Sequence, residues 1–272
     1  MKHLPLVVVA ALAAGCAGRT APAAAPAAPA EPTTLRYTPG TSHYRLDSQT
    51  HVEQGMMGSA DITTAALLNT AVAQADGNLG VAITFDSLGI TASMGAPDPA
   101  ELSAARGKVV RLVVSPAGLP ISLTPPESVS PAVLQMAQGL RDFFPALPPA
   151  SMAAGTTWSD TGTVTTPNMG LAVTVKMSRQ HRIAGWEDHA GTHALHIATT
   201  ATYVVTGSGD VQGQAITLDG SGQGTSDAYV SAAGVYLGGA ARDSTLVNAN
   251  VTGAGMVVPV RRTTRSTITR LP

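Results

Sequence analysis

The chain has 272 residues and a formal net charge of -1, and only 12% of its residues are charged, against about a quarter in typical soluble domains. Nucleic acid and anionic lipid headgroups both attract proteins with an excess of Lys and Arg, so the composition argues against both as partners. An apolar fraction of 44% indicates a packed core, and the many Val, Thr and Gly residues favour strands joined by turns.

The N-terminus has the features of an export signal. After the basic Lys2, an apolar run over residues 4–14 is about half as long as a membrane-spanning helix. Leu12-Ala13-Ala14-Gly15-Cys16 resembles the lipobox of bacterial lipoproteins, although that family prefers Leu where this chain has Ala13. The resemblance implies that residues 1–15 are a lipoprotein signal peptide and that lipid on Cys16 holds the protein to a membrane.

Cys16 is the only cysteine in the chain. It therefore has no partner for an internal disulfide, and lipid attachment explains its position. In the same family, Ala17 in place of a retaining Asp implies the outer membrane when the cell has two membranes. A plain secretory signal with an incidental cysteine stays open, as does a retained anchor helix, which the short apolar run disfavours. Residues 16–34, rich in Ala and Pro, are predicted to form an extended tether without fixed structure.

The folded domain is predicted to span residues 35–272 and to begin with strands. Side chains alternate between apolar and polar over residues 42–54, which predicts a half-buried strand. Residues 60–75 favour a second strand, although their Ala-rich middle leaves a helix open. Asp76-Gly77-Asn78 predicts a hairpin into a strand over residues 79–85.

Two helices are predicted next, with strands over residues 108–124 between them. Asp98-Pro99-Ala100-Glu101 has the cap, the proline and the glutamate of a helix start. Ser130-Pro131 opens a longer helix that Pro145 ends. Apolar residues at helical spacing form one face of this second helix: Val133, Leu134, Ala137, Leu140 and Phe144.

The rest of the chain is predicted to be strands. The candidates are residues 157–166, 171–183, 192–206, 214–218, 226–230, 235–237, 244–251 and 257–269. We interpret the Gly-rich segments 207–210 and 220–224 as hairpin turns, because a phosphate-binding loop needs a helix start directly behind it.

Two fragments recur at nearly the same offset along the chain. Residues 40–44 resemble residues 155–158, and residues 114–119 resemble residues 230–235. The pattern indicates either an internal duplication, with halves 35–149 and 150–272, or a generic strand-entry turn that is used twice.

These patterns predict a mainly β fold of the α+β class, a large antiparallel, curved sheet or half-barrel with two short helices. The layout resembles a family of uncharacterised envelope lipoproteins. Its members share a Gly-Thr/Asp-x-Trp strand start in mid-chain, here Gly155-Thr156-Thr157-Trp158, and a late Gly-rich strand pair before an aromatic, here residues 220–224 and then Tyr229. At the level of fold it also resembles the half-barrel of lipoprotein carriers, which implies helices over a concave, apolar face that holds acyl chains.

The candidate metal ligands are His189, His193 and His196, which lie near two carboxylates. Zinc needs ligands that converge on one point, whereas His193 and His196 are three residues apart and would face opposite sides of a strand. We therefore expect a polar turn here, and no metal or other cofactor. Because no Gly-x-Ser-x-Gly elbow marks a nucleophile, we expect no enzyme.

Two functions stay open at this point. One is a membrane-anchored, non-catalytic envelope lipoprotein that binds lipid or another apolar ligand at the helix face of Val133, Leu134, Ala137 and Phe144. The alternative is a structural or partner-binding envelope protein with no small ligand. It would contact another envelope protein through the sheet surface or through residues 261–265.

Overall fold

The computed structural model of the chain describes residues 32–55, 58–168, 170–211 and 213–272. Residues 31–272 form one compact unit, and the fold below is that of this unit. The predicted signal peptide, Cys16 and the tether up to residue 31 lie outside the described residues.

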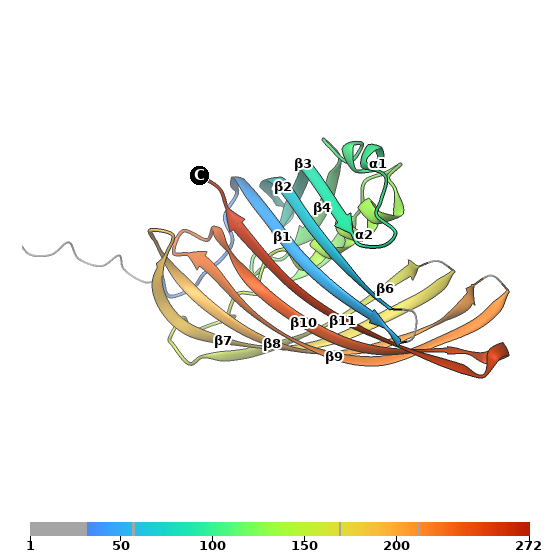
Figure 1. Ribbon diagram of the computed structural model, residues 1–272. Helices are drawn as coiled ribbons and strands as arrows, with labels where there is room; N and C mark the ends of the chain where they lie inside the picture. Colours follow the sequence, from blue (N-terminus) through green and yellow to red (C-terminus); the bar gives the residue numbers. More distant parts are fainter. Residues whose placement is uncertain (1–31, 56–57, 169, 212) are drawn as a thin grey trace, which may run out of the picture. The chain divides into compact units, whose positions relative to one another are not determined.

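In this part of the chain, eleven strands form one antiparallel, curved sheet (Figure 1). Neighbouring strands follow the order β5-β4-β3-β2-β1-β11-β10-β9-β8-β7-β6. Their bounds are β1 Gly40–Gln54, β2 Ser59–Ala75, β3 Asn78–Ala92, β4 Val109–Val114, β5 Pro120–Thr124, β6 Thr157–Asn168, β7 Leu171–His189, β8 Thr192–Val211, β9 Gln214–Ser231, β10 Tyr236–Val251 and β11 Met256–Arg270. The prediction of a mainly β, half-barrel fold is confirmed.

The order of the strands requires the middle of the chain to cross from one edge of the sheet to the other. β1 pairs with β11, so the first and last strands are neighbours in the interior of the sheet. β5 and β6 consequently lie at opposite edges, and residues 125–156 must connect them. We call residues 125–156 the crossing segment. It carries the second helix and lies over the concave face of the sheet (Figure 1).

The described chain has two short helices, as predicted. In α1 (Pro99–Ser103), the Asp98 carboxylate accepts a hydrogen bond of 2.8 Å from the backbone N–H of Ala100. The second helix, α2 (Pro131–Gly139), is shorter than predicted. It passes into a 3₁₀ turn, η2 (Leu140–Asp142), whose tighter winding ends before Phe144. The prediction that Phe144 belongs to this helix is therefore wrong.

The Gly-rich segments are not hairpin turns, and this prediction is also wrong. Residues 220–224 lie in the interior of β9, and residues 207–210 lie near the end of β8. A Cβ atom on Gly220 would meet the Cα of Val247 at 2.7 Å, and one on Gly222 would meet the Ser244 carbonyl oxygen at 2.6 Å. These positions need glycine because the strongly curved sheet brings β10 too close for a side chain. The predicted strands 214–218 and 226–230 are consequently one continuous strand.

The second pair of recurring fragments, residues 114–119 and 230–235, occupies comparable turns. Ser115 N–H donates to the Leu119 carbonyl at 2.9 Å between β4 and β5, and Ser231 N–H donates to the Val235 carbonyl at 2.9 Å between β9 and β10. In each turn the serine hydroxyl oxygen also accepts a hydrogen bond of 3.1 Å from the last residue. The two turns share a geometry, and duplication of the halves stays a prediction.

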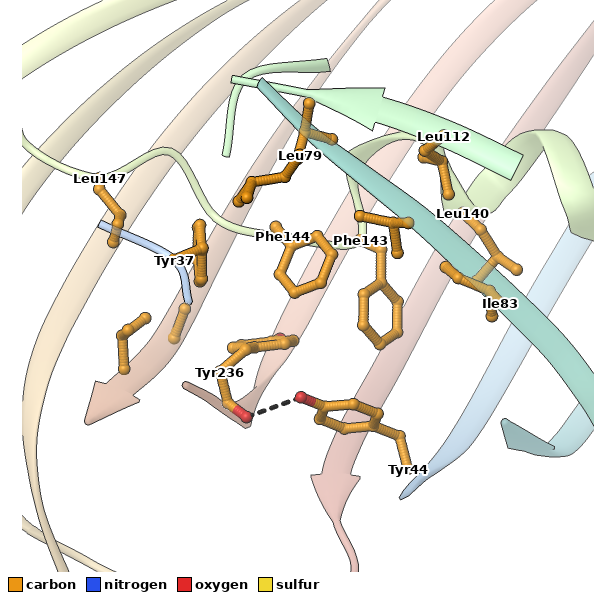
Figure 2. Close-up of a cluster of buried hydrophobic side chains, with 14 of the residues drawn as sticks. Tyr37, Tyr44, Leu79, Ile83, Leu112, Leu140, Phe143, Phe144, Leu147 and Tyr236 are labelled. Carbon is orange, nitrogen blue, oxygen red and sulfur yellow. Dashed lines mark hydrogen bonds between the residues drawn. The ribbon is translucent and has the colours of Figure 1, made fainter. Parts of the chain in front are cut away.

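The core lies between the crossing segment and one end of the concave face. Five aromatic rings meet there, those of Tyr37, Tyr44, Phe143, Phe144 and Tyr236 (Figure 2). The Tyr44 hydroxyl donates to the Tyr236 carbonyl at 2.9 Å, and the Tyr37 hydroxyl donates to the Pro145 carbonyl at 2.8 Å. The first bond joins β1 to β10, and the second joins the segment before β1 to the crossing segment. Buried hydroxyls are normally satisfied by hydrogen bonds in this way.

Candidate functional site: a cavity on the concave face

A cavity of about 400 Å³ lies between the crossing segment and strands β7 to β11. This volume is within the range of small-molecule sites. Its apolar walls come from the core, and include Leu46, Phe143, Phe144, Tyr236 and Ile268. Its other walls are polar, so the cavity has two chemically different ends.

Small residues on β9 and β10 leave this space open. Gly224, Ser226 and Ala228 border the cavity from β9, and Gly239 and Ala241 border it from β10. Because side chains alternate along a strand, these residues occupy successive positions on one face. A Cβ on Gly224 would meet the Tyr203 hydroxyl at 2.9 Å. The cavity therefore exists because two neighbouring strands, β9 and β10, carry small residues on this face.

At the polar end, Arg179 of β7 binds two carboxylates. Its Nε lies 2.6 Å from Asp160 Oδ1 of β6, and its Nη1 lies 2.8 Å from Asp142 Oδ1 of η2. The second pair joins the crossing segment to the sheet. Burial by itself would raise the pKa of Asp160, but hydrogen bonds from His181 and Arg179 and the Arg179 charge outweigh it, so this pKa is lowered.

His181 extends the same network inward. Its Nε2 lies 3.0 Å from Asp160 Oδ2, and its Nδ1 lies 2.9 Å from the Thr199 hydroxyl. Only 3% of His181 is exposed, and its ring stacks on Trp158 at 5.0 Å. Both Arg179 and His181 share a face of β7 with the buried Ile183, because they alternate with outward-facing residues.

This Asp160, His181 and Thr199 chain has the residue types of a catalytic triad, but its surroundings suit a structural role. Acyl transfer also needs backbone N–H groups that are free to bind an oxyanion. The ladder is uninterrupted here, since Thr199 pairs with His181 on one side and Ser226 on the other. The N–H groups around Thr199 are therefore engaged by neighbouring strands.

Tyr203 and Asp243 form a further polar contact at the cavity. The Tyr203 hydroxyl of β8 donates to Asp243 Oδ1 of β10 at 2.6 Å, across the intervening Gly224 of β9. Burial raises the pKa of Tyr203, and the bond to Asp243 raises it further. The hydroxyl thus stays protonated and fixes the position of this carboxylate.

The predicted ligand-binding residues are divided by the structure. Phe144 lines the cavity, whereas Val133, Leu134 and Ala137 lie outside its lining. Val133 packs in a separate small cluster with Leu102 and Ala105, and Ala137 is part of the main core. The structure thus places these four residues in different surroundings, because α2 presents its buried residues to two different clusters. Their part in ligand binding stays a prediction.

The three predicted metal candidates stack on aromatic rings, two of them on the same ring. His189 and His196 stack on Tyr229, at ring distances of 3.7 and 4.7 Å, while His193 stacks on Trp186 at 5.3 Å. His196 also lies between Glu187 and Asp227, at 3.2 and 2.8 Å. Among the residues that the structure describes, no group of three His, Cys, Asp or Glu side chains has metal-binding geometry.

Sequence reasoning missed the polar end of the cavity. Arg179, His181 and Tyr203 lie inside long strands, at positions that alternate with exposed residues. The signal that marks them is a charged or polar residue on the same face as a buried Ile or Val. Their partners Asp142, Asp160 and Asp243 come from three other elements, and pairing over such separations leaves no local pattern.

No helix in the described ranges is both long and apolar enough to cross a membrane. The chain matches no protein-family model and no curated protein. One solved structure with some similarity is that of OccK2 (OpdF) of Pseudomonas aeruginosa, which is 8% identical, with a TM-score of 0.26, over 85% of this chain and 98% of that chain. Another is that of a loop-deletion mutant of OmpT, an outer membrane protein of Vibrio cholerae. It is 9% identical, with a TM-score of 0.24, over 85% of this chain and 99% of that chain. Similarity this low carries no argument about function.

Proposed function

We propose that the protein is a non-catalytic envelope lipoprotein, anchored by lipid on Cys16, whose folded domain holds a small ligand with an apolar body in the concave cavity. The observation that carries the binding function is the cavity itself. It is bounded by buried aromatic rings on one side and by a fixed polar network on the other, which is the composition of a small-molecule site.

Binding suits the polar residues better than catalysis does. Arg179, Asp160 and His181 satisfy one another by hydrogen bonds, and the strand ladders engage the neighbouring backbone groups. A network with these properties orients a ligand without reacting with it. The aromatic wall supplies the affinity, since burying apolar surface contributes about 25 cal/mol per Å².

Native mass spectrometry of the full-length protein after gentle extraction tests the binding function. We expect a copurifying small molecule, and we expect the variant Ala241→Phe to lose it, because the larger side chain fills the cavity from β10. The matched control is Ala65→Phe, at an exposed position of β2. A ligand-free wild-type protein, or equal retention by both variants, would overturn the proposal.

Lipid anchoring is tested separately. Cells that express the wild-type chain or Cys16→Ser are fed labelled palmitate and then fractionated. We expect label and membrane association in the wild type, and loss of both in the variant, because the thiol is the acceptor of the diacylglycerol in the lipobox family. Normal processing and membrane association of Cys16→Ser would contradict anchoring at this residue.

One observation favours the alternative, a partner-binding function without a small ligand. Arg242 of β10 and Arg265 of β11 are directly opposed and both exposed, and like charges opposite each other destabilise a sheet. An acidic partner of the envelope would relieve this repulsion. Crosslinking in cells, compared between wild type and a double Arg242→Gln, Arg265→Gln variant, should trap a defined partner only in the wild type if this function holds.

A further inference from the structure

The cavity's polar end has an excess of negative charge. Asp142 and Asp243 line it, Asp160 lies directly behind, and Arg179 is the only Lys or Arg among the described lining residues. The space itself does not depend on these charges, because small residues on β9 and β10 create it.

Arg179, the lining residue with a permanent positive charge, is already paired with two carboxylates. Arg179 directs Nε to Asp160 and Nη1 to Asp142, at 2.6 and 2.8 Å. An anionic headgroup would have to compete with two carboxylates for this guanidinium, and would lie beside Asp243 as well. Arg262, exposed on β11, lies two residues from Thr264, the cross-strand partner of Asp243, but it is not among the lining residues.

Acceptor oxygens, in contrast, remain available. Asp142 receives Arg179 on Oδ1, and Asp243 receives the Tyr203 hydroxyl on Oδ1. The second oxygen of each carboxylate has no hydrogen bond among the contacts of the described residues. Each carboxylate is thus held in position by one oxygen, and the other is suited to accept from a donor in the cavity.

We propose that the ligand is an amphiphile with a cationic amine or ammonium head, bound between Asp142 and Asp243, and with its apolar chain against Phe143, Phe144 and Tyr236. This inference rests on the proposed ligand-binding function and names the ligand class. Anionic amphiphiles such as fatty acids are discriminated against, because the described lining residues offer them no unpaired cation.

Three probes of equal chain length separate the headgroup from the chain: octylamine, octanol and octanoate. Their affinities are measured by calorimetry on the full-length lipoprotein in nanodiscs of phosphatidylcholine, with empty nanodiscs subtracted. At neutral pH we expect octylamine to bind about tenfold more tightly than octanol, since hydrogen bonds to charged groups are the stronger ones, and octanoate to bind most weakly.

Asp243→Asn is the matched variant, because its amide oxygen still accepts from Tyr203 while the charge is removed. We expect it to lose the preference for octylamine over octanol and to leave octanol affinity unchanged. Asp219→Asn, at an exposed position of β9, is the control and should bind all three probes as the wild type does.

The outcomes are distinguishable. Equal affinity for octylamine and octanol, tighter binding of octanoate, or an unchanged preference in Asp243→Asn each overturns the cationic head while keeping the ligand-binding function. Absence of binding for all three probes overturns the ligand-binding function, and the headgroup proposal with it.

Discussion

The concave face is built differently at its two ends. Beneath the crossing segment, residues such as Phe85, Ile183 and Ile197 are fully buried. At the far ends of β6 to β11, a continuous cross-strand row faces the same way but only one of its valines is buried: Val164, Val175, Val205, Gly220, Val247 and Val260. In Figure 1 both helices lie away from the second end, where the β10–β11 hairpin is seen at the lower right. We call these the covered end and the open end.

The comparison shows that alternation of apolar and polar side chains along a strand is not sufficient to make a core. Both ends place apolar residues on the concave face at every second position. In the part of the chain that the structure describes, only the covered end has a second layer, and a sheet needs another element to bury its apolar face. The cavity and its polar network lie at the boundary between the two ends, where the second layer stops.

Alkaline pH should have the largest effect on stability, and it should act through the covered end. Burial raises the pKa of Tyr37, Tyr44 and Tyr236, and that of Tyr44 reaches about 12. These groups contribute stability that is present below the ordinary value of 10.0 and is lost as the pH rises through their folded-state values. We expect cooperative unfolding above pH 10, with tyrosinate absorbance and circular dichroism changing together. Ionisation of these tyrosines with an intact sheet would show that the covered end is loosely packed.

The next largest effect should come from truncating an aromatic residue at the covered end. Phe143→Ala removes a ring that is 3% exposed and contacts Tyr44, Phe144 and Tyr236, and we expect a loss of about 3–5 kcal/mol in the free energy of unfolding. Val175→Ala at the open end should cost less than about 1 kcal/mol, because its side chain is only half-buried. Urea unfolding measures both, and similar costs would abolish the distinction between the ends.

Breaking the ion pair at the boundary should have an intermediate effect. Arg179→Met leaves Asp160 without its cation, and we expect a loss of about 2 kcal/mol, below the range for fully buried pairs because 17% of the Arg179 side chain is exposed. Arg45→Met, at an exposed pair with Asp47, should change stability little.

Acid titration offers a check on the same pair. Because the pKa of Asp160 is lowered, its contribution is present above the ordinary value of 3.8 and is lost as the pH falls through the folded-state value. Stability of the wild type should therefore decrease below about pH 4, and Arg179→Met should show a smaller decrease. Parallel pH profiles for the two proteins would exclude the pair as a source of acid sensitivity.

The last comparison concerns the curvature that the open end requires. A Cβ on Gly220 would meet backbone atoms of β10, so we expect Gly220→Ala to cost about 1–3 kcal/mol through displacement of the strand. The same substitution at Gly253, where nothing lies within 4 Å of the added atom, should be close to neutral. Thermal denaturation of the two variants compares them, and a neutral Gly220→Ala would mean that the curvature has another origin.

Local patterns in the sequence were sufficient for the fold class. Strand alternation over residues 42–54, the hairpin at Asp76-Gly77, and the cap at Asp98 all have their predicted structures. These features depend on nearest neighbours in the chain, which is why they could be predicted. The Gly residues of β9 were wrongly predicted to form turns, because what requires glycine there is the neighbouring strand β10 and not their own segment.

The sequence by itself therefore determined the antiparallel, half-barrel class, the two short helices and the prediction of a lipid anchor at Cys16. Only the tertiary structure decided that β1 pairs with β11, that the crossing segment consequently lies over the concave face, and that Asp142, Asp160 and Asp243 meet near Arg179 and Tyr203. The physical reason is that local propensity acts over a few residues, whereas strand order and the cavity result from burying apolar surface between segments far apart in the chain.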